Sequence, residues 1–160
     1  MAGDQRLAQL QQLQRRGDLH GAAQLLAKLV QERPRDLNLR FQFAASLVGI
    51  GAVEPAIPQL EQILKAKPGE PRVSYCLSTA HHRAGDIEKA HRVLNEAMRR
   101  RAPDPMLCAG KAELFNVQGR FAEAMDVLEP VLAASAGSVM VLFAYSRACA
   151  GAAEDGQEEA

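Results

Sequence analysis

The sequence predicts an all-α fold, an α–α superhelix in which antiparallel helical hairpins stack on one another. The first observation is a glycine that recurs every 34 residues, at Gly17, Gly51, Gly85 and Gly119. The second is that two segments with the apolar spacing of amphipathic helices flank each glycine. The third is composition: Ala and Leu dominate, aromatic residues make up 4%, and Trp is absent, which favours helices over a β-sandwich.

Two further series share this period and predict how each hairpin packs. They are Ala22, Ala56, Ala90 and Ala124, and Leu26, Leu60, Leu94 and Leu128. The glycine is expected just after the first helix, where a left-handed backbone is accessible without a Cβ. The alanine is expected where two helix backbones approach closely, and the leucine is expected to fill the space beside it.

Capping residues predict where the helices begin. Asp36, Asp104 and Ser138 occupy one register and suit the N-cap of a first helix, and Glu70 is the exception. Asp18 and Asp86 suit the N-cap of a second helix.

These registers divide the chain into repeats. The predicted domain is residues 1–151, with repeats at 3–36, 37–70, 71–104 and 105–138 and a partial or capping repeat at 139–151. Residues 152–160 are expected to be an acidic tail, or a turn at Gly156 followed by the start of a further helix.

These residues and their 34-residue period resemble the tetratricopeptide repeat (TPR) family, from residue 3 to about 151. The resemblance implies a concave groove, lined by the first helices, that binds a partner protein or peptide. Carried over by register, the candidate groove residues are Asn38, Phe41, Arg72, Tyr75, Thr79, His82, Arg83, Met106, Glu113, Asn116, Phe143 and Arg147, together with Ala45, Ala109 and Met140.

Aromatic and arginine residues are the most informative of these candidates, because both types anchor interfaces. Phe41, Tyr75 and Phe143 share one register, and their rings either face the groove or pack between neighbouring first helices. Where co-chaperone TPR domains carry a Lys and an Asn that clamp a carboxylate, this chain has Leu7 and Gln11. Binding of an acidic chaperone tail is therefore disfavoured.

Several classes of function are disfavoured by composition. Lys+Arg and Asp+Glu both number 19, whereas nucleic-acid-binding domains are usually basic. No apolar run reaches the roughly 18 residues that a membrane span needs, so no membrane insertion is expected. Three cysteines without a CxxC pair, and a start without the features of a signal peptide, favour a cytoplasmic location. His81, which lies near Cys76, shares a register with Leu13, Leu47 and Phe115 and is expected in the core, so no metal or cofactor is predicted.

Three functions remain open. The first is a protein-interaction scaffold, and the sequence has none of the catalytic motifs that would indicate an enzyme within this chain. The second is the N-terminal arm of a larger enzyme, for which bacterial TPR-sulfotransferases offer a similar layout. The third is a self-assembling scaffold, in which the open repeat at residues 139–151 contacts a second copy.

Overall fold

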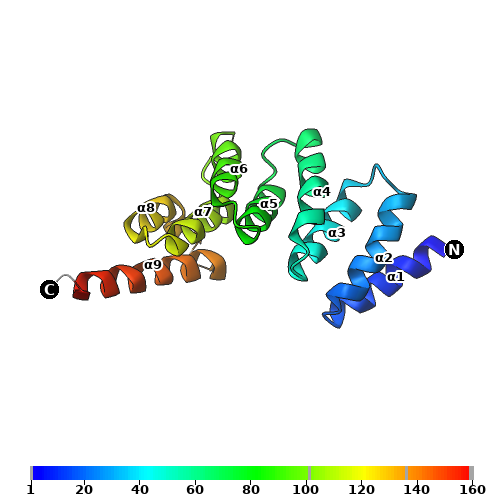
Figure 1. Cartoon of the computed structure of the whole chain (residues 1–160), viewed down its shortest axis with the longest axis horizontal. Coiled ribbons are helices and arrows are strands. Elements are labelled where there is room, and N and C mark those ends of the chain that lie inside the picture. The colour runs from blue at the N-terminus through cyan, green and yellow to red at the C-terminus, as the bar shows by residue number, and fades with distance from the viewer. Residues whose placement is uncertain (1, 101, 136, 159–160) are drawn as a thin grey trace. The chain divides into compact units, whose positions relative to one another are not determined.

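The computed structural model describes residues 2–100, 102–135 and 137–158, and the side chains of residues 5–154 apart from 101 and 136. Within this part the chain forms nine α-helices and one short 3-10 helix, and no described residue lies in a strand (Figure 1). The all-α helical-repeat fold is thus confirmed. None of the described helices is both long and apolar enough to cross a membrane.

The chain forms two compact units, residues 1–68 and residues 69–160. The first unit lies inside the domain predicted over 1–151, and the second contains the rest of that domain and the residues after it. Helical repeats divide readily in this way because each helix packs mainly against its neighbours in sequence. The helices of the first unit are α1 (Ala2–Arg15), α2 (Leu19–Glu32), α3 (Leu37–Gly49) and α4 (Val53–Ala66). Within this unit α1 packs against α2, α2 against α3, and α3 against α4.

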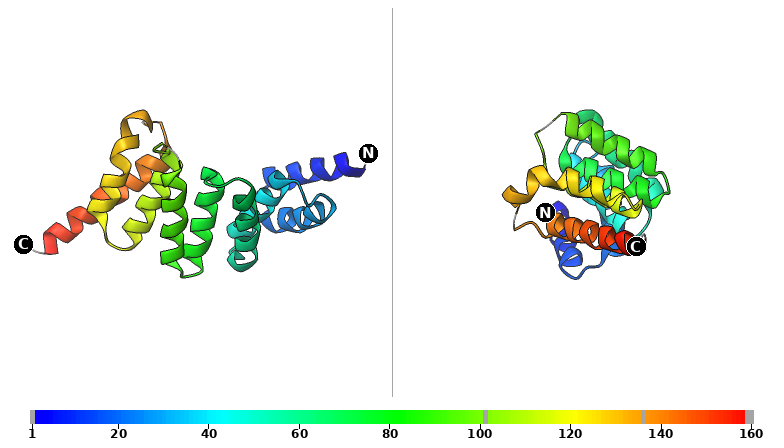
Figure 2. Two further views of the ribbon diagram at one scale, coloured as in Figure 1. Left: turned by 90° about the horizontal axis from the view of Figure 1, so that it is seen from above. Right: turned by 90° about the vertical axis from the view of Figure 1, so that its left-hand side faces the viewer.

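The second unit contains two hairpins and a long final helix. Its elements are α5 (Pro71–Arg83), α6 (Ile87–Arg99), α7 (Pro105–Val117), α8 (Phe121–Leu132), the 3-10 helix η1 (Ala133–Ser135) and α9 (Val139–Glu158). Helix α7 packs against both α5 and α9, and α9 packs against α8 as well. The red end of α9 extends past α7 and α8 in Figure 1 and in the left view of Figure 2.

One turn geometry is repeated in all four hairpins. The predicted glycines have φ angles between 70° and 83°, in the left-handed region. The residue after each glycine donates its amide to the carbonyl five positions earlier, as from Asp86 to His81 at 2.9 Å. This bond satisfies a carbonyl at the end of the first helix that would otherwise lack a partner. The turn therefore ends one helix and aims the next in the same way in every repeat.

Aspartate side chains fix the start of four helices, as predicted. Asp36 accepts hydrogen bonds from the amides of Asn38 and Leu39, both at 3.0 Å. Asp104 does the same for the amides of Met106 and Leu107 at the start of α7. Asp18 and Asp86 cap the second helices α2 and α6 by accepting from Gly21 and Lys89. Glu70, the exception in residue type at this register, makes no side-chain cap at the start of α5.

The periodic alanines and leucines form the tightest part of the core. All eight are 0% exposed: Ala22, Ala56, Ala90, Ala124, Leu26, Leu60, Leu94 and Leu128. They belong to the second helices, where each hairpin needs a small side chain at the point of closest approach and a large one a turn later. The predicted register of the hairpins is confirmed at these positions.

The last helix differs from the expectation. Residues 152–160 were predicted to be either an acidic tail or a turn at Gly156 before a further helix. No turn occurs at Gly156, since α9 remains helical to Glu158, and Glu159 and Ala160 lie outside the described residues. The alanines and glutamates around Gly156 favour helix, and one interior glycine costs only about 1 kcal/mol relative to alanine. A lone glycine without a following capping residue is therefore too weak a signal to end this helix.

Substitution of Leu94 by alanine tests the core register. Because Leu94 is fully buried, Leu94→Ala leaves a cavity and should lower the free energy of unfolding by about 2–5 kcal/mol in urea titrations. The matched control is Arg92→Ala, two positions away and exposed on the same helix, for which a change within about 0.5 kcal/mol is expected. Equal effects of the two substitutions would contradict the register.

A second substitution tests the close approach of the two helices in a hairpin by adding volume at Ala90 instead of removing it. Ala90→Leu adds volume where no space is available and should destabilise the protein by about 1–3 kcal/mol, seen as a lower melting temperature. Ala122→Leu places the same side chain at an exposed site of α8 and should leave the melting temperature nearly unchanged. A neutral Ala90→Leu would mean that the hairpin interior is looser than its burial indicates.

Candidate functional site

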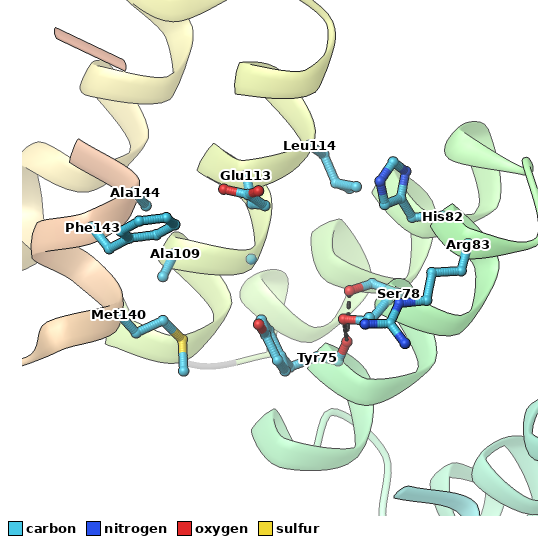
Figure 3. Close-up of a pocket in the computed structure, with 12 residues that line it drawn as sticks. Tyr75, Ser78, His82, Arg83, Ala109, Glu113, Leu114, Met140, Phe143 and Ala144 are labelled. Atoms are coloured by element: carbon cyan, nitrogen blue, oxygen red, sulfur yellow. Dashed lines mark hydrogen bonds between the residues drawn. The ribbon is translucent and has the colours of Figure 1, made fainter. Parts of the chain in front are cut away.

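An open groove of about 370 Å³ lies in the second unit, between helices α5, α7 and α9. All three are the first helices of their repeats. The residues that line it are Tyr75, Ser78, Thr79, His82 and Arg83 from α5, Ala109, Gly110, Glu113 and Leu114 from α7, and Met140, Phe143 and Ala144 from α9. The groove is thus built from residues far apart in sequence that the repeat brings together (Figure 3).

The groove has space between its aromatic side chains because α7 has a small residue where its neighbours have rings. Tyr75, Ala109 and Phe143 occupy one register, 34 residues apart. Beside Ala109, Gly110 lies against the ring of Tyr75, and a Cβ on Gly110 would be 2.8 Å from Tyr75 Cδ2. The ring therefore rests directly on the α7 backbone, which only a glycine at this position permits.

The two ends of the groove differ in chemistry (Figure 3). Met140 and Phe143 form an apolar end, and 60% of Phe143 is exposed to solvent. His82 and Arg83 lie at the other end, where the arginine supplies a positive charge. Tyr75 and Glu113 lie between these ends in Figure 3. A ligand with one apolar and one anionic group would match this arrangement.

Two hydroxyl groups of α5 form hydrogen bonds with the backbone of Tyr75. The hydroxyls of Ser78 and Thr79 both donate to the backbone carbonyl of Tyr75, at 2.8 and 3.0 Å. Burial raises the pKa of Tyr75, and the nearby Glu113 carboxylate raises it further. A phenol is already protonated at neutral pH, so the raised pKa only extends to more alkaline pH the range in which the Tyr75 hydroxyl is an uncharged donor.

The carboxylate of Glu113 is paired across the groove wall. Arg147 Nη1 of α9 donates to Glu113 Oε1 of α7, and both side chains are partly exposed. An exposed ion pair of this kind contributes about 0–1 kcal/mol to stability. Its main effect here is electrostatic, since Arg147 offsets the negative charge that Glu113 brings to the groove wall.

The structure places just over half of the predicted groove residues together. Eight of the fifteen candidates line the groove: Tyr75, Thr79, His82, Arg83, Ala109, Glu113, Met140 and Phe143. Arg147 reaches its wall through Glu113, whereas Met106, which is half-buried, and Arg72, which is exposed, lie outside the lining. Asn38, exposed, and Phe41 and Ala45, both half-buried, lie on α3 in the first unit.

Asn116 was predicted to lie on the groove surface, but it is buried. It is only 5% exposed, and its Nδ2 donates to the carbonyl of Ala144 at 2.9 Å. The side chain thus links α7 to α9 and is not available on the groove surface. Register alone could not show this, because His82 occupies the equivalent position on α5 and does line the groove.

Four lining residues were missed by the sequence analysis: Ser78, Gly110, Leu114 and Ala144. Gly110 left a signal that could have been used. A glycine inside a predicted helix costs about 1 kcal/mol relative to alanine, which usually means that another group packs against its backbone. The other three resemble ordinary helix-packing residues and left no such signal.

Two other side-chain clusters have structural roles. His81 is buried at 6% exposure, as its apolar register predicted. Among the described residues, no group of three His, Cys, Asp or Glu side chains is placed to hold a metal ion. Arg99 and Arg100, at the end of α6, both pair with Glu96 on the same helix.

Comparison with known proteins agrees with this architecture. Two family models, both described as tetratricopeptide repeat, match residues 13–78 and 71–96. No curated protein matches the sequence. The periodicity of the chain and these two models identify the repeat independently.

Three solved structures are similar in fold. MamA (41-end) from Desulfovibrio magneticus RS-1 has a TM-score of 0.68 and 20% identity over 79% of this chain and 72% of that chain. A thermophilic TPR protein from Thermus thermophilus has a TM-score of 0.69 and 21% identity, covering 96% and 93%. A tetratricopeptide repeat protein from Parabacteroides merdae ATCC 43184 has a TM-score of 0.72 and 13% identity, covering 94% and 60%.

At these identities the structures establish the fold alone, and the family rests on the sequence models and the repeated residues. The two models together span residues 13–96, and the same turns, caps and buried alanines continue beyond them through α7 and α8. The chain therefore belongs to the tetratricopeptide repeat family, with four full repeats and a partial fifth.

Proposed function

We propose that this chain is a protein-interaction module that binds a segment of a partner protein in the groove between α5, α7 and α9. Membership of the tetratricopeptide repeat family supports an interaction role in general. The observation that carries the specific site is the hollow itself, where an exposed Phe143 and a half-buried Tyr75 surround a volume of about 370 Å³. Such a volume fits one or two side chains of a bound segment and not a whole domain.

The apolar end is proposed to take an aliphatic or aromatic side chain of the partner. Phe143, Met140 and Tyr75 would contact it, and its burial would cover the exposed part of Phe143. Burying an aliphatic or aromatic side chain of the partner contributes about 1.5–3 kcal/mol. This contact would supply most of the affinity, because aromatic side chains in pockets are the usual anchors of interfaces.

The other end is proposed to take an acidic side chain or a terminal carboxylate. Arg83 offers a guanidinium that can bind a carboxylate through two parallel hydrogen bonds, and His82 lies beside it. Glu113 would repel the partner's charge, but Arg147 offsets it. The equal numbers of basic and acidic residues in the whole chain favour a protein over a nucleic acid as the partner. The cytoplasmic location stays a prediction.

A double substitution in the groove tests this proposal. Peptides selected from a random display library on the wild-type protein should be enriched in an apolar residue close to an acidic one. Tyr75→Ala with Arg83→Ala should weaken the binding of a selected, labelled peptide at least tenfold in fluorescence anisotropy, because both ends of the groove lose their contact. Circular dichroism should show unchanged helix content.

The matched control removes similar groups outside the groove. Val117→Ala with Arg92→Ala changes two exposed positions on α7 and α6, and the peptide should bind it as it binds the wild type. Equal affinity of all three proteins, or selected peptides with no common pattern, would count against the groove as the binding site.

Gly110→Ala gives a second test that acts through Tyr75. The added Cβ would lie 2.8 Å from Tyr75 Cδ2, so the ring must leave its present position, and we expect it to narrow the groove. We expect peptide affinity to fall several-fold while helix stability is maintained, because alanine favours helix by about 1 kcal/mol over glycine. In a Tyr75→Ala background the same substitution should have no further effect on affinity, and an equal loss in both backgrounds would contradict the mechanism.

A further inference from the structure

Helix α9 presents to solvent a face that is covered in its counterpart α7. At the register of Cys108, Ala112 and Phe115, which are 1%, 0% and 9% exposed in α7, helix α9 carries Leu142, Ser146 and Cys149. Leu142 is 46% exposed, and Ser146 and Cys149 are also exposed. In α7 these three residues are buried in one core with residues of α8, its hairpin partner, and of α9.

The rest of α9 is well packed, so the exposed face is not a sign of a loosely attached helix. Val141, Ala144 and Ala148 are buried in one core with residues of α7 and α8. Gly151 allows the ring of Phe121 from α8 to lie directly against the α9 backbone. One side of the helix is therefore fixed, and the opposite side is exposed to solvent.

The exposed side is an uncharged stripe along more than three turns. It consists of Val139, Leu142, Phe143, Ser146, Cys149, Ala150 and Ala153, which lie within about one third of the helix circumference. Val139 is 80% exposed and Phe143 is 60% exposed. A continuous, largely apolar stripe of this kind is unusual on a solvated surface and marks an interaction site. We call this set of residues the outer stripe.

We infer that the outer stripe pairs with the outer stripe of a second copy of this chain, in an antiparallel, two-fold arrangement. The argument is the order of side-chain sizes. Large residues occupy the N-terminal half of the stripe, and small residues occupy the C-terminal half. Antiparallel pairing centred on Ser146 places Leu142 opposite the second copy's Ala150, and Phe143 opposite the second copy's Cys149. Large side chains then meet small ones along the whole contact, as close packing of two helices requires.

Charge also favours this pairing. The stripe contains no charged residue, so two copies meet without burying like charges. Glu154, exposed near the acidic end of α9, would lie near the N-terminal end of the second copy's α9, where the helix dipole is positive. A parallel arrangement would instead place the acidic ends of both helices side by side. Leu142 belongs to the outer stripe alone, whereas Phe143 belongs to both the stripe and the groove lining, so the two surfaces share one ring.

Sedimentation velocity across a concentration series tests the inference. The wild type should shift from the mass of one chain to that of two as concentration rises. Leu142→Glu, which would bury two unpaired carboxylates per dimer, should weaken the dimer at least tenfold. The control is Val117→Glu, because Val117 is similarly exposed at 48% on α7 but lies outside the stripe, and its dimer should match the wild type.

Two outcomes would overturn the inference: a wild type that stays monomeric at every concentration, leaving the stripe to some other partner, or a dimer that Leu142→Glu does not weaken. Ala150→Glu, at an exposed helical position, repeats the test should Leu142→Glu disturb folding, which circular dichroism would reveal. At concentrations where the wild type is monomeric, Leu142→Glu should bind the peptide as the wild type does, because Leu142 does not line the groove, which separates this inference from the groove proposal.

Cross-linking tests the antiparallel register. In a Cys149→Ser background, Ser146→Cys lies at the two-fold axis and should form a disulfide-linked dimer under mild oxidation. Val117→Cys in the same background should not. Equal cross-linking of both variants, or none for Ser146→Cys in a protein that sediments as a dimer, would contradict the pairing.

Discussion

The close approach of the two helices in each hairpin governs the rest of the structure. Ala90 and its three equivalents have no solvent exposure, and the leucine four residues later fills the adjacent space completely. This contact requires a small side chain at one position and a fixed turn before it, which the glycine with its left-handed backbone supplies. Once this geometry is set in every repeat, the first helices of successive repeats in the second unit lie side by side.

The groove arises from a local departure within that regular frame. Helices α5 and α9 place Tyr75 and Phe143 at one register, whereas α7 has Ala109 there and Gly110 beside it. A ring at the α7 position would fill the hollow. Because Gly110 has no side chain, the Tyr75 ring packs directly against the α7 backbone, and space remains between the aromatic groups. A regular backbone thus creates a specific concave site through two small residues.

Helix α9 has a different role on each of its sides. One side is buried against α7 and α8, a second contributes Met140 and Phe143 to the groove, and the third carries the outer stripe. The same helix would therefore connect ligand binding and self-association, with Phe143 at the border of both surfaces. Arg147, through its pair with Glu113, links this helix to α7 and offsets the charge of the groove wall.

The fold could be predicted from the sequence more completely than the site. The period of 34 residues, the glycine turns, the aspartate caps and the buried alanines were all predictable, because each depends on residues close together in one repeat. His81 in the core followed from the same periodicity. The end of α9 was mispredicted, since a lone Gly156 carries little weight against the helix-forming residues around it.

The sequence by itself determined which helices form and which faces of them are buried, since these follow from local propensity and spacing. Only the tertiary structure decided which first-helix residues meet. Tyr75, Glu113 and Phe143 lie together in the groove. Asn116 instead is buried and donates a hydrogen bond to the Ala144 carbonyl. The tertiary structure also showed that Gly110 is a packing site for a ring and that the outer stripe of α9 is exposed. These features depend on packing between helices of different repeats, so the surroundings of each residue come from segments about 34 positions away. The register of a residue within its own helix does not identify those neighbouring residues.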